Sequence, residues 1–330
     1  MLQFCEQVPA TKSLLKKWGM RTVHEWFADR VVRAQLPDGQ SLSLGLNENY
    51  LSFELFWKGA AYYEPITTLV ARELIRPGVT FIDVGANIGF YSLVLSLSQP
   101  GLPVVAFEPN PRIFRLLQSN LRLNNFDHIC CHPVALSDQD GSAKLHLTDS
   151  DMSASLETDF QLETETVEVT TTTLDSYLGR QPVSGPLFIK VDVEGHEAAF
   201  FRGAAETLEK RQPDIICEIT GPLDEETTAI LRQTGYRFYQ ITDEGLLPSS
   251  ELKLVVRGRF LFLNYLLSAK PPDQVDAIFQ RIQDRVREID LTQTSKCVDP
   301  DMIRHLRSRE SVMREQREPR KKRTIPDLAA

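Results

Sequence analysis

The sequence is short of the features that define several large classes of protein. Its five cysteines, at positions 5, 130, 131, 217 and 297, are odd in number and form no C-x-x-C pair, which excludes a disulfide framework and a structural zinc site. No apolar run approaches the roughly 20 residues that cross a bilayer, so we expect no membrane span. The first 19 residues lack a basic start followed by an apolar core, so we expect no secretory signal and a reducing, cytoplasmic location.

An excess of positive charge is also missing. The 330 residues carry 37 Lys and Arg against 45 Asp and Glu, a formal net charge of -8 at pH 7. This balance excludes a nucleic-acid-binding surface as the main feature of the protein. With 42% hydrophobic residues, the chain is long enough for a sizeable core. We therefore expect an ordinary globular protein with no nucleic-acid partner.

The most informative segment is FIDVGANIGFYS, residues 81–92, an apolar strand followed by an acid, a glycine-rich turn and the start of a helix. Asp83, Gly85, Asn87 and Gly89 give the turn the form D-x-G-x-N-x-G. Glycine permits positive φ and the close approach of a ligand, and asparagine tolerates the left-handed region, so Asn87 can stand between the glycines. The spacing departs from the G-x-G-x-x-G of dinucleotide-binding turns. The segment predicts a turn that binds a nucleotide cofactor.

A second acidic residue follows the next predicted strand, at a position from which it could bind a cofactor ribose. The apolar run 104–107 ends in Glu108, and Pro109 follows. Glu108 lies 25 positions after Asp83 (108 minus 83), the length of one strand–helix–strand unit. An acid at the end of the second strand of such a unit can accept the hydroxyls of a ribose. A solvated loop acid is the alternative, and the glycine turn upstream favours ribose binding.

Strand-like and helix-like segments alternate along most of the chain. We expect strands over 79–84, 103–107, 129–135, 187–193, 214–219, 236–241 and 259–265, and helices over 64–76, 89–98, 111–123, 197–210 and 224–234. Alternation of this kind predicts an α/β fold with a mainly parallel, doubly wound sheet and an antiparallel closing strand. Residues 141–172 change to period-two alternation around a polar stretch, which predicts an inserted β excursion.

The two flanks differ from the centre. A helix-like stretch over 14–26 precedes a Pro-Asp-Gly turn at 37–39, which predicts a hairpin within 31–46. Residues 275–289 carry an apolar stripe at helical spacing, which we expect to dock on the chain's own domain. We divide the chain into an accessory or cap region over 1–65, a central domain over 66–268, and a helical extension with a basic tail over 269–330.

The segment FIKVDVEGHE, residues 188–197, holds the densest set of chemically active side chains. A strand would place Asp192 and Glu194 on one face, and Gly195 would let the chain turn so that His196 and Glu197 open a helix. Three interpretations are open. One of Asp192, Glu194 and His196 acts as a general base; or these three bind Mg²⁺ or Mn²⁺; or Asp192 binds the cofactor, Glu197 caps the helix and His196 bonds the backbone.

Taken together, these segments resemble the FkbM family of S-adenosylmethionine-dependent methyltransferases. FIDVGANIGFYS, AFEPNP, VALSDQDG, TTLDSYL and IKVDVEGHE stand in the order typical of that family, over about residues 65–220. The resemblance implies a class I Rossmann-like methyltransferase fold in the central domain and S-adenosyl-L-methionine as the cofactor. It implies ribose binding by Glu108, adenine near Ala135 and Leu136, and the methionine end near Asp192. The predicted cofactor-binding set is Asp83, Gly85, Asn87, Gly89, Glu108, Pro109, Ala135, Leu136 and Asp192.

The resemblance also implies methyl transfer to a hydroxyl of a sugar, glycan or natural-product acceptor. The catalytic candidates are Asp192, Glu194 and His196; a divalent metal is possible but not favoured, and no metal ligand is assigned. The expected partner is a small-molecule or glycan acceptor, and a homo-oligomer is left open. Two alternatives stand beside this function. A nicotinamide-dependent oxidoreductase has the glycine spacing against it, and a non-catalytic S-adenosylmethionine-binding protein has the intact DVEGHE segment against it.

Overall fold

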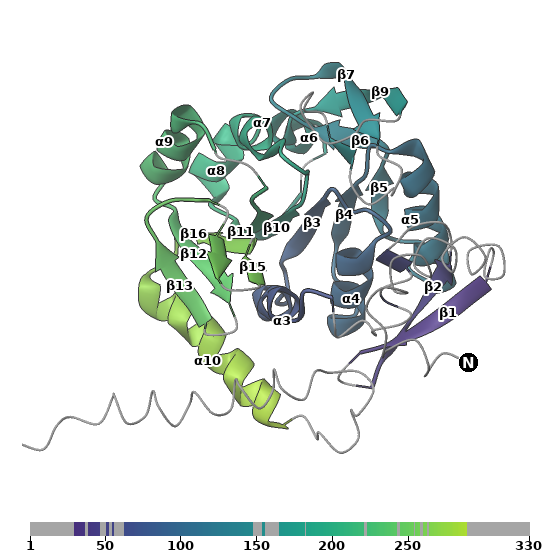
Figure 1. Cartoon of the computed structure of the whole chain (residues 1–330), viewed down its shortest axis with the longest axis horizontal. Coiled ribbons are helices and arrows are strands. Elements are labelled where there is room, and N and C mark those ends of the chain that lie inside the picture. Colours follow the sequence, from purple (N-terminus) through teal and green to yellow (C-terminus); the bar gives the residue numbers. More distant parts are fainter. Residues whose placement is uncertain are drawn as a thin grey trace, which may run out of the picture.

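A central eight-stranded sheet organises the computed structural model (Figure 1). The structure describes residues 30–36, 39–46, 51–52, 55, 63–147, 154–155, 165–181, 183–220, 223–242, 245–253, 255–257, 260–262 and 264–288. Along the sheet the strands are β13 (Gly245–Ser249), β12 (Arg237–Thr242), β16 (Asn264–Ser268), β11 (Asp214–Glu218), β10 (Leu187–Val191), β3 (Thr80–Val84), β4 (Val104–Phe107) and β5 (Cys130–His132).

Strands β5, β4, β3, β10 and β11 run parallel, and β16, β12 and β13 are antiparallel to their neighbours. This mainly parallel sheet with an antiparallel edge confirms the predicted fold class. Because the parallel strands share one direction, their carboxyl ends meet at one edge of the sheet.

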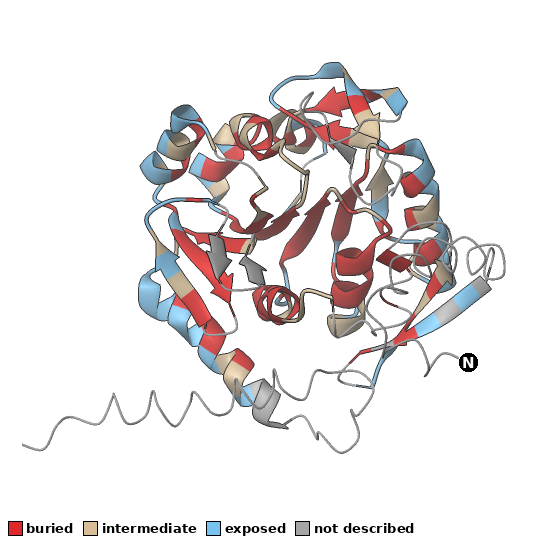
Figure 2. Ribbon diagram, in the orientation of Figure 1, coloured by how far each residue is buried: buried red, intermediate tan, exposed pale blue. Residues whose placement is uncertain are grey.

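Helices cover both faces of the sheet, which is why its central strands are buried throughout (Figure 2). On β3, Phe81 packs into the core on one face, and Ile82 and Val84 pack into the core on the other. The first face is covered by α3 (Pro65–Leu74), α4 (Phe90–Ser98), α5 (Pro111–Leu123) and α10 (Pro272–Glu288). The second is covered by α6 (Leu174–Arg180), α7 (Glu197–Arg202), α8 (Ala205–Arg211) and α9 (Glu225–Gln233).

Helix α5 begins and ends where it was predicted. Asn110 is its N-cap, and its side-chain oxygen accepts hydrogen bonds from the backbone N–H groups of Arg112 and Ile113. Pro111 occupies the first turn, where the N–H that proline lacks would have no partner. The cap thus starts α5 directly after Glu108 and holds the end of β4 in place.

The predicted strand over 129–135 is in fact two strands in different sheets. Pro133 separates β5 from β6 (Val134–Leu136), since proline supplies no N–H to a strand ladder. β6 joins a second sheet of order β6-β9-β7-β8, with β7 (Gly141–Leu147), β8 (Ala154–Ser155) and β9 (Glu165–Thr172). β7 and β9 pair antiparallel, which confirms the inserted excursion.

The predicted helix over 197–210 is likewise two helices, α7 and α8. The break falls at Gly203, where a Cβ atom would lie 1.9 Å from the carbonyl oxygen of Ser137. The carboxylate of Asp175, in α6, accepts hydrogen bonds from the backbone N–H groups of Glu206 and Thr207 at 2.8 and 2.9 Å. This cap, provided by a residue about 30 positions earlier in the chain, makes α8 begin as a separate helix, and the sequence around residue 205 does not predict it.

Two further predictions need correction. The strand over 187–193 ends at Val191, and the strand over 259–265 is replaced by β15 (Phe260–Phe262), which pairs with β14 (Val255–Arg257), and by β16. The edge strand β13 was not predicted. The other strands and helices of the central domain lie within about two residues of their predicted ends.

Both flanks contact the central domain where they are described. β1 (Arg30–Gln35) and β2 (Ser41–Leu46) form the predicted hairpin. Asn120 in α5 and Asn124, the C-cap residue of α5, accept hydrogen bonds from Gly45 N and Ser43 N. In α10, Val275, Phe279 and Ile282 are buried, which confirms that this stripe docks on its own domain. The helix-like stretch 14–26 and the basic tail lie outside the described residues. No helix in the described ranges is long and apolar enough to cross a membrane.

We predict that Gly203→Ala destabilises the protein by about 1–3 kcal/mol, because the new methyl group must displace the Ser137 backbone. Gly179→Ala is the matched control: Gly179 lies in α6, and a Cβ atom added there would have no other atom within 4 Å. In a helix this change is neutral or stabilises by up to about 1 kcal/mol. Urea unfolding of both variants measures the difference, and equal stabilities would contradict the close contact.

Candidate active site

A cavity of about 270 Å³ opens at the carboxyl ends of the parallel strands. Its lining includes seven of the nine residues predicted to bind a cofactor: Gly85, Asn87, Glu108, Pro109, Ala135, Leu136 and Asp192. Asp192, Glu194 and His196, from the loop after β10, line the same cavity. The structure thus brings together segments that lie more than 100 residues apart in the sequence, because the carboxyl ends of parallel strands meet at one edge of the sheet.

The turn after β3 has the backbone conformation that its residues favour. Gly85, Asn87 and Gly89 have φ values of 76°, 50° and 91°. A Cβ atom on Gly85 would lie 1.8 Å from the carbonyl oxygen of Asp192, so only glycine fits there. The N–H groups of Gly85 and Ala86 both donate to the carbonyl oxygen of Phe107. The turn is therefore fixed between β4 and the loop after β10.

Glu108 joins the turn to the end of β4. Its Oε2 atom accepts a hydrogen bond from Asn87 N at 2.9 Å, and its Oε1 atom accepts one from Asn110 N at 2.8 Å. The side chain is buried, and burial raises the pKa of Glu108 to about 7. Each carboxylate oxygen has a second lone pair. Glu108 can therefore still accept a ligand hydroxyl while it holds the turn.

Asp83 and Gly89 lie outside the cavity lining. Asp83 is 2% exposed, and its Oδ2 atom accepts hydrogen bonds from Ser92 N at 3.0 Å and Ser92 Oγ at 2.6 Å. Gly89 is the N-cap of α4, where a Cβ atom would lie 2.6 Å from Leu117 Cδ1. In this structure both residues hold the turn and the start of α4 in position.

The loop after β10 differs from its prediction in detail. Because the strand ends at Val191, Asp192 and Glu194 are not on one strand face, and Glu194 has a left-handed φ of 50°. Asp192 Oδ2 lies 3.4 Å from Lys190 Nζ, and His196 Nε2 lies 2.9 Å from Ser137 Oγ.

Glu197 begins α7, as predicted, but its carboxylate is buried. Its Oε1 atom accepts hydrogen bonds from Gly195 N and Thr220 Oγ1. Burial raises the pKa of Glu197. These bonds tie the loop after β10 to the loop after β11.

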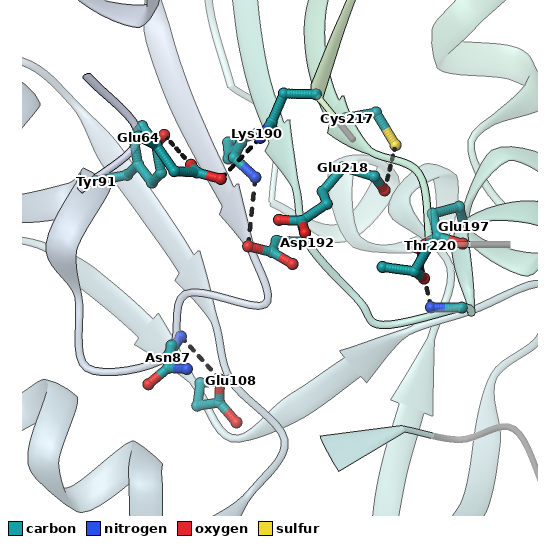
Figure 3. A network of polar contacts seen from close by, with 12 residues as sticks. Glu64, Asn87, Tyr91, Glu108, Lys190, Asp192, Glu197, Cys217, Glu218 and Thr220 are labelled. Carbon is teal, nitrogen blue, oxygen red and sulfur yellow. Dashed lines mark hydrogen bonds and ion pairs between the residues drawn. The ribbon is translucent and has the colours of Figure 1, made fainter. Parts of the chain in front are cut away.

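A second group of polar residues beside the cavity was not predicted (Figure 3). Glu64, immediately before α3, accepts hydrogen bonds from the hydroxyl of Tyr91 and from Asn264 Nδ2. Lys190 is 1% exposed, and its ammonium lies 5.3 Å from the centre of the Tyr91 ring. Burial alone would lower the pKa of Lys190, but the carboxyl groups of Asp192, Glu64 and Glu218 raise it, so Lys190 stays charged.

Glu218 completes this group at the carboxyl end of β11, and it lines the cavity. Burial and the neighbouring carboxyl groups of Asp192 and Glu64 raise the pKa of Glu218 to about 10. A sequence signal for Glu218 existed, since it lies next to the end of the predicted strand 214–219, much as Glu108 directly follows the predicted strand 103–107. Glu64 offered no such signal, because it reaches the cavity only through the packing of α3.

The described residues contain no group of three or more His, Cys, Asp or Glu side chains arranged to hold a metal ion. Asp192 faces Lys190, and His196 faces Ser137, so the two residues have different partners. The geometry does not support the interpretation in which Asp192, Glu194 and His196 bind Mg²⁺ or Mn²⁺.

A glycine turn after the first parallel strand, an acid after the second, and a cavity at the strand carboxyl ends define a Rossmann-like α/β protein of the nucleotide-cofactor-binding class. Residues 83–238 match the model of the methyltransferase FkbM domain. The match covers a little under half of the chain, and it bears out the resemblance to the FkbM family that the motifs predicted.

Several known proteins are similar to parts of the chain. Methyltransferase 1 of Beauveria bassiana is 29% identical over 141 residues, 37% of this chain and 57% of that protein. The 31-O-demethyl-FK506 methyltransferase FkbM of Streptomyces tacrolimicus is 50% identical over 46 residues, 14% of this chain and 18% of that protein. The two matches thus span 57% and 18% of the lengths of these relatives, so each covers only part of the relative.

Among solved structures, a methyltransferase FkbM from Methylobacillus flagellatus KT is 17% identical with a TM-score of 0.38. The match covers 63% of this chain and 47% of that one.

We predict that Asp83 makes stability depend on pH. Burial raises the pKa of Asp83 from 3.8 to about 6, so the native state keeps a proton that the unfolded chain releases above about pH 4. The resulting stabilisation is full below pH 4 and is lost as the pH rises through 6, a loss of about 3 kcal/mol. Asp83→Asn should remove this loss, whereas Asp127→Asn, at an exposed site, should keep it. Urea unfolding at pH 4 and pH 7 tests the difference between the variants.

Proposed function

We propose that the protein is an S-adenosylmethionine-dependent O-methyltransferase that acts on a hydroxyl of a sugar, glycan or natural-product acceptor. The observation that carries the proposal is Glu108, held by two backbone N–H groups at the cavity of an FkbM methyltransferase domain. The S. tacrolimicus relative is named for methylating 31-O-demethyl-FK506, which supports oxygen as the acceptor atom.

The residues around the cavity suit the proposed cofactor. Gly85 and Asn87 line the cavity, so the turn after β3 faces the space that a ligand would occupy. Glu108 offers a carboxyl group for ribose hydroxyls, Ala135 and Leu136 offer apolar surface for adenine, and Asp192 offers a carboxylate for the methionine end. When bound, S-adenosylmethionine supplies a methyl group on a positively charged sulfur.

The charge of the cavity supports an acceptor that is not an anion. Five carboxyl groups line it, and no Lys or Arg is among the described lining residues. A phosphate or carboxylate would be repelled at such short range. An alcohol, however, is a poor nucleophile while it keeps its proton, so a base beside it is needed. Asp192, Glu194 and His196 stay candidates for catalysis, and all three line the cavity.

Each of the three parts of the chain has a place in this proposed function. We propose that residues 66–268 form the catalytic domain and that residues 1–65 form the accessory region at the cavity, which Leu51 lines. Residues 269–330 would be an extension docked through α10. A cytoplasmic location and a homo-oligomer are compatible with this arrangement.

We predict that S-adenosylhomocysteine binds with micromolar affinity and that Glu108→Gln weakens this binding by about tenfold or more, because the ribose loses a charged acceptor. Calorimetric titration measures both values, with NADH as the control ligand. Glu209→Gln, at an exposed site, is the matched variant and should bind as the wild type does. Binding of NADH instead of S-adenosylhomocysteine would favour an oxidoreductase, and unchanged affinity in Glu108→Gln would remove the ribose role.

We also predict that a chelator leaves methyl transfer unchanged. Lys190 already supplies the positive charge beside Asp192, so a metal ion has no charge to balance there. The measurement is transfer of a labelled methyl group to a panel of hydroxylated acceptors, with and without EDTA. Activity that EDTA abolishes and Mg²⁺ restores would revive the metal interpretation, and cofactor binding without transfer to any acceptor would favour a binding protein.

A further inference from the structure

Three carboxyl groups converge on one part of the cavity from separate elements (Figure 3). Asp192 follows β10, Glu218 ends β11, and Glu64 precedes α3. The side chains of Asp192 and Glu218 point toward the same space in Figure 3. The glycine turn and Glu108 lie at the neighbouring strands β3 and β4. The two sides of the cavity are therefore chemically different: one suits a nucleotide, and the other is a cluster of acids.

The acids of the cavity differ in how far they are already engaged. Both oxygens of Glu108 accept backbone N–H groups, and both oxygens of Glu64 accept side-chain donors. Asp192 is paired with Lys190. Within the described part of the chain, no hydrogen bond or ion pair is assigned to the carboxyl group of Glu218. It is thus the acid whose oxygens are most open to a ligand.

His196 is less suited to act as the base. Its Nε2 atom is within hydrogen-bond distance of Ser137 Oγ, so that ring nitrogen already has a partner. Ser137 in turn is fixed by its own N–H, which donates to the carbonyl oxygen of Thr172. His196 therefore joins the loop after β10 to the inserted sheet, and this contact positions the cavity wall.

Resting on the proposed function, we propose that Glu218 is the catalytic residue that takes the proton from the acceptor hydroxyl. In this step the O–H proton moves to the Glu218 carboxylate, and the freed electron pair of the oxygen forms the new bond to carbon. The donor sulfur keeps the electron pair of the bond that breaks. The carboxyl groups of Asp192 and Glu64 are close enough to act electrostatically on Glu218, so an acceptor hydroxyl at Glu218 would lie in a polar environment.

Glu218 must lose its own proton before it can act. With the cavity empty, burial and nearby acids raise the pKa of Glu218 to about 10, so it is protonated at pH 8. A cation in the same cavity favours the charged form of a carboxyl group and lowers its pKa. The donor carries a positive sulfur, whereas the product S-adenosylhomocysteine does not. Donor binding should therefore release the proton of Glu218, and product binding should not.

The charged groups that act on Glu218 come from each element around it. Three acids raise the pKa of Glu218: Glu64 before α3, and Asp192 and Glu194 after β10. The ammonium of Lys190 in β10 lowers it. Lys190 stays charged, and its effect is common to the empty and the filled cavity. The proton released on donor binding must then come from one of the acids, and substituting the acids one at a time identifies which one releases it.

The test counts protons released on binding. Calorimetric titrations of the full chain with S-adenosylmethionine and with S-adenosylhomocysteine, at pH 8 in phosphate and in Tris, give the number of protons for each ligand. In the wild type, S-adenosylmethionine should release on the order of one proton more than S-adenosylhomocysteine. Glu218→Gln should abolish this difference while it binds S-adenosylhomocysteine as the wild type does. Glu209→Gln, at an exposed site away from the cavity lining, should keep the difference.

The possible outcomes separate the two proposals. If S-adenosylhomocysteine does not bind the wild type, the proposed function fails. If it binds but the wild type shows no difference between the ligands, or if the difference persists in Glu218→Gln, Glu218 is not the base. Glu218→Asp provides a second variant should the glutamine variant not fold, and it should release its proton at a different pH.

Turnover gives an independent readout. On any acceptor found in the screen, Glu218→Gln should slow methyl transfer by about 10²–10⁴-fold, the contribution typical of a general base. His196→Asn, which keeps a polar partner for Ser137, should slow it less. The reverse order would assign the base to His196.

Discussion

The contact between the turn after β3 and the backbone after β10 is the constraint on which the site depends. Gly85 approaches the carbonyl oxygen of Asp192 so closely that a Cβ atom would lie 1.8 Å away. Asp192 N donates to the carbonyl oxygen of Val84 at 2.9 Å, so the two strand ends are joined at the same point. This contact sets the distance between the turn after β3 and the loop after β10. A side chain at residue 85 would force the two walls of the cavity apart.

Lys190 has a comparable role in the electrostatics. A fully buried ammonium is costly unless it is paired, and here acids on three elements surround it. Its ammonium lies 3.4 Å from Asp192 Oδ2, and the carboxyl groups of Glu64 and Glu218 also act on it. One buried ammonium thus offsets part of the repulsion among three neighbouring carboxyl groups.

Much of the site could be predicted because its signals are local. Asn110 and Pro111 mark a helix start by their capping chemistry, and Glu108 and Asp192 follow apolar strands whose ends must meet in a parallel sheet. Where prediction failed, the cause was a distant partner. Gly203 is packed on Ser137, and Asp175 caps α8 from another helix. Pro133 was a local signal that the apolar character of its neighbours obscured.

The sequence by itself determined most of the strands and helices, the glycine turn after β3 and the acids near strand ends, because these depend on backbone conformation and on period-two or helical spacing. Only the tertiary structure decided which acids share a cavity and what state of protonation they have. Glu64 reaches Asn264 from 200 positions away, and the pKa values of Glu218 and Lys190 depend on burial and on each other. Burial and electrostatic coupling are properties of the packed chain, and no short segment carries them.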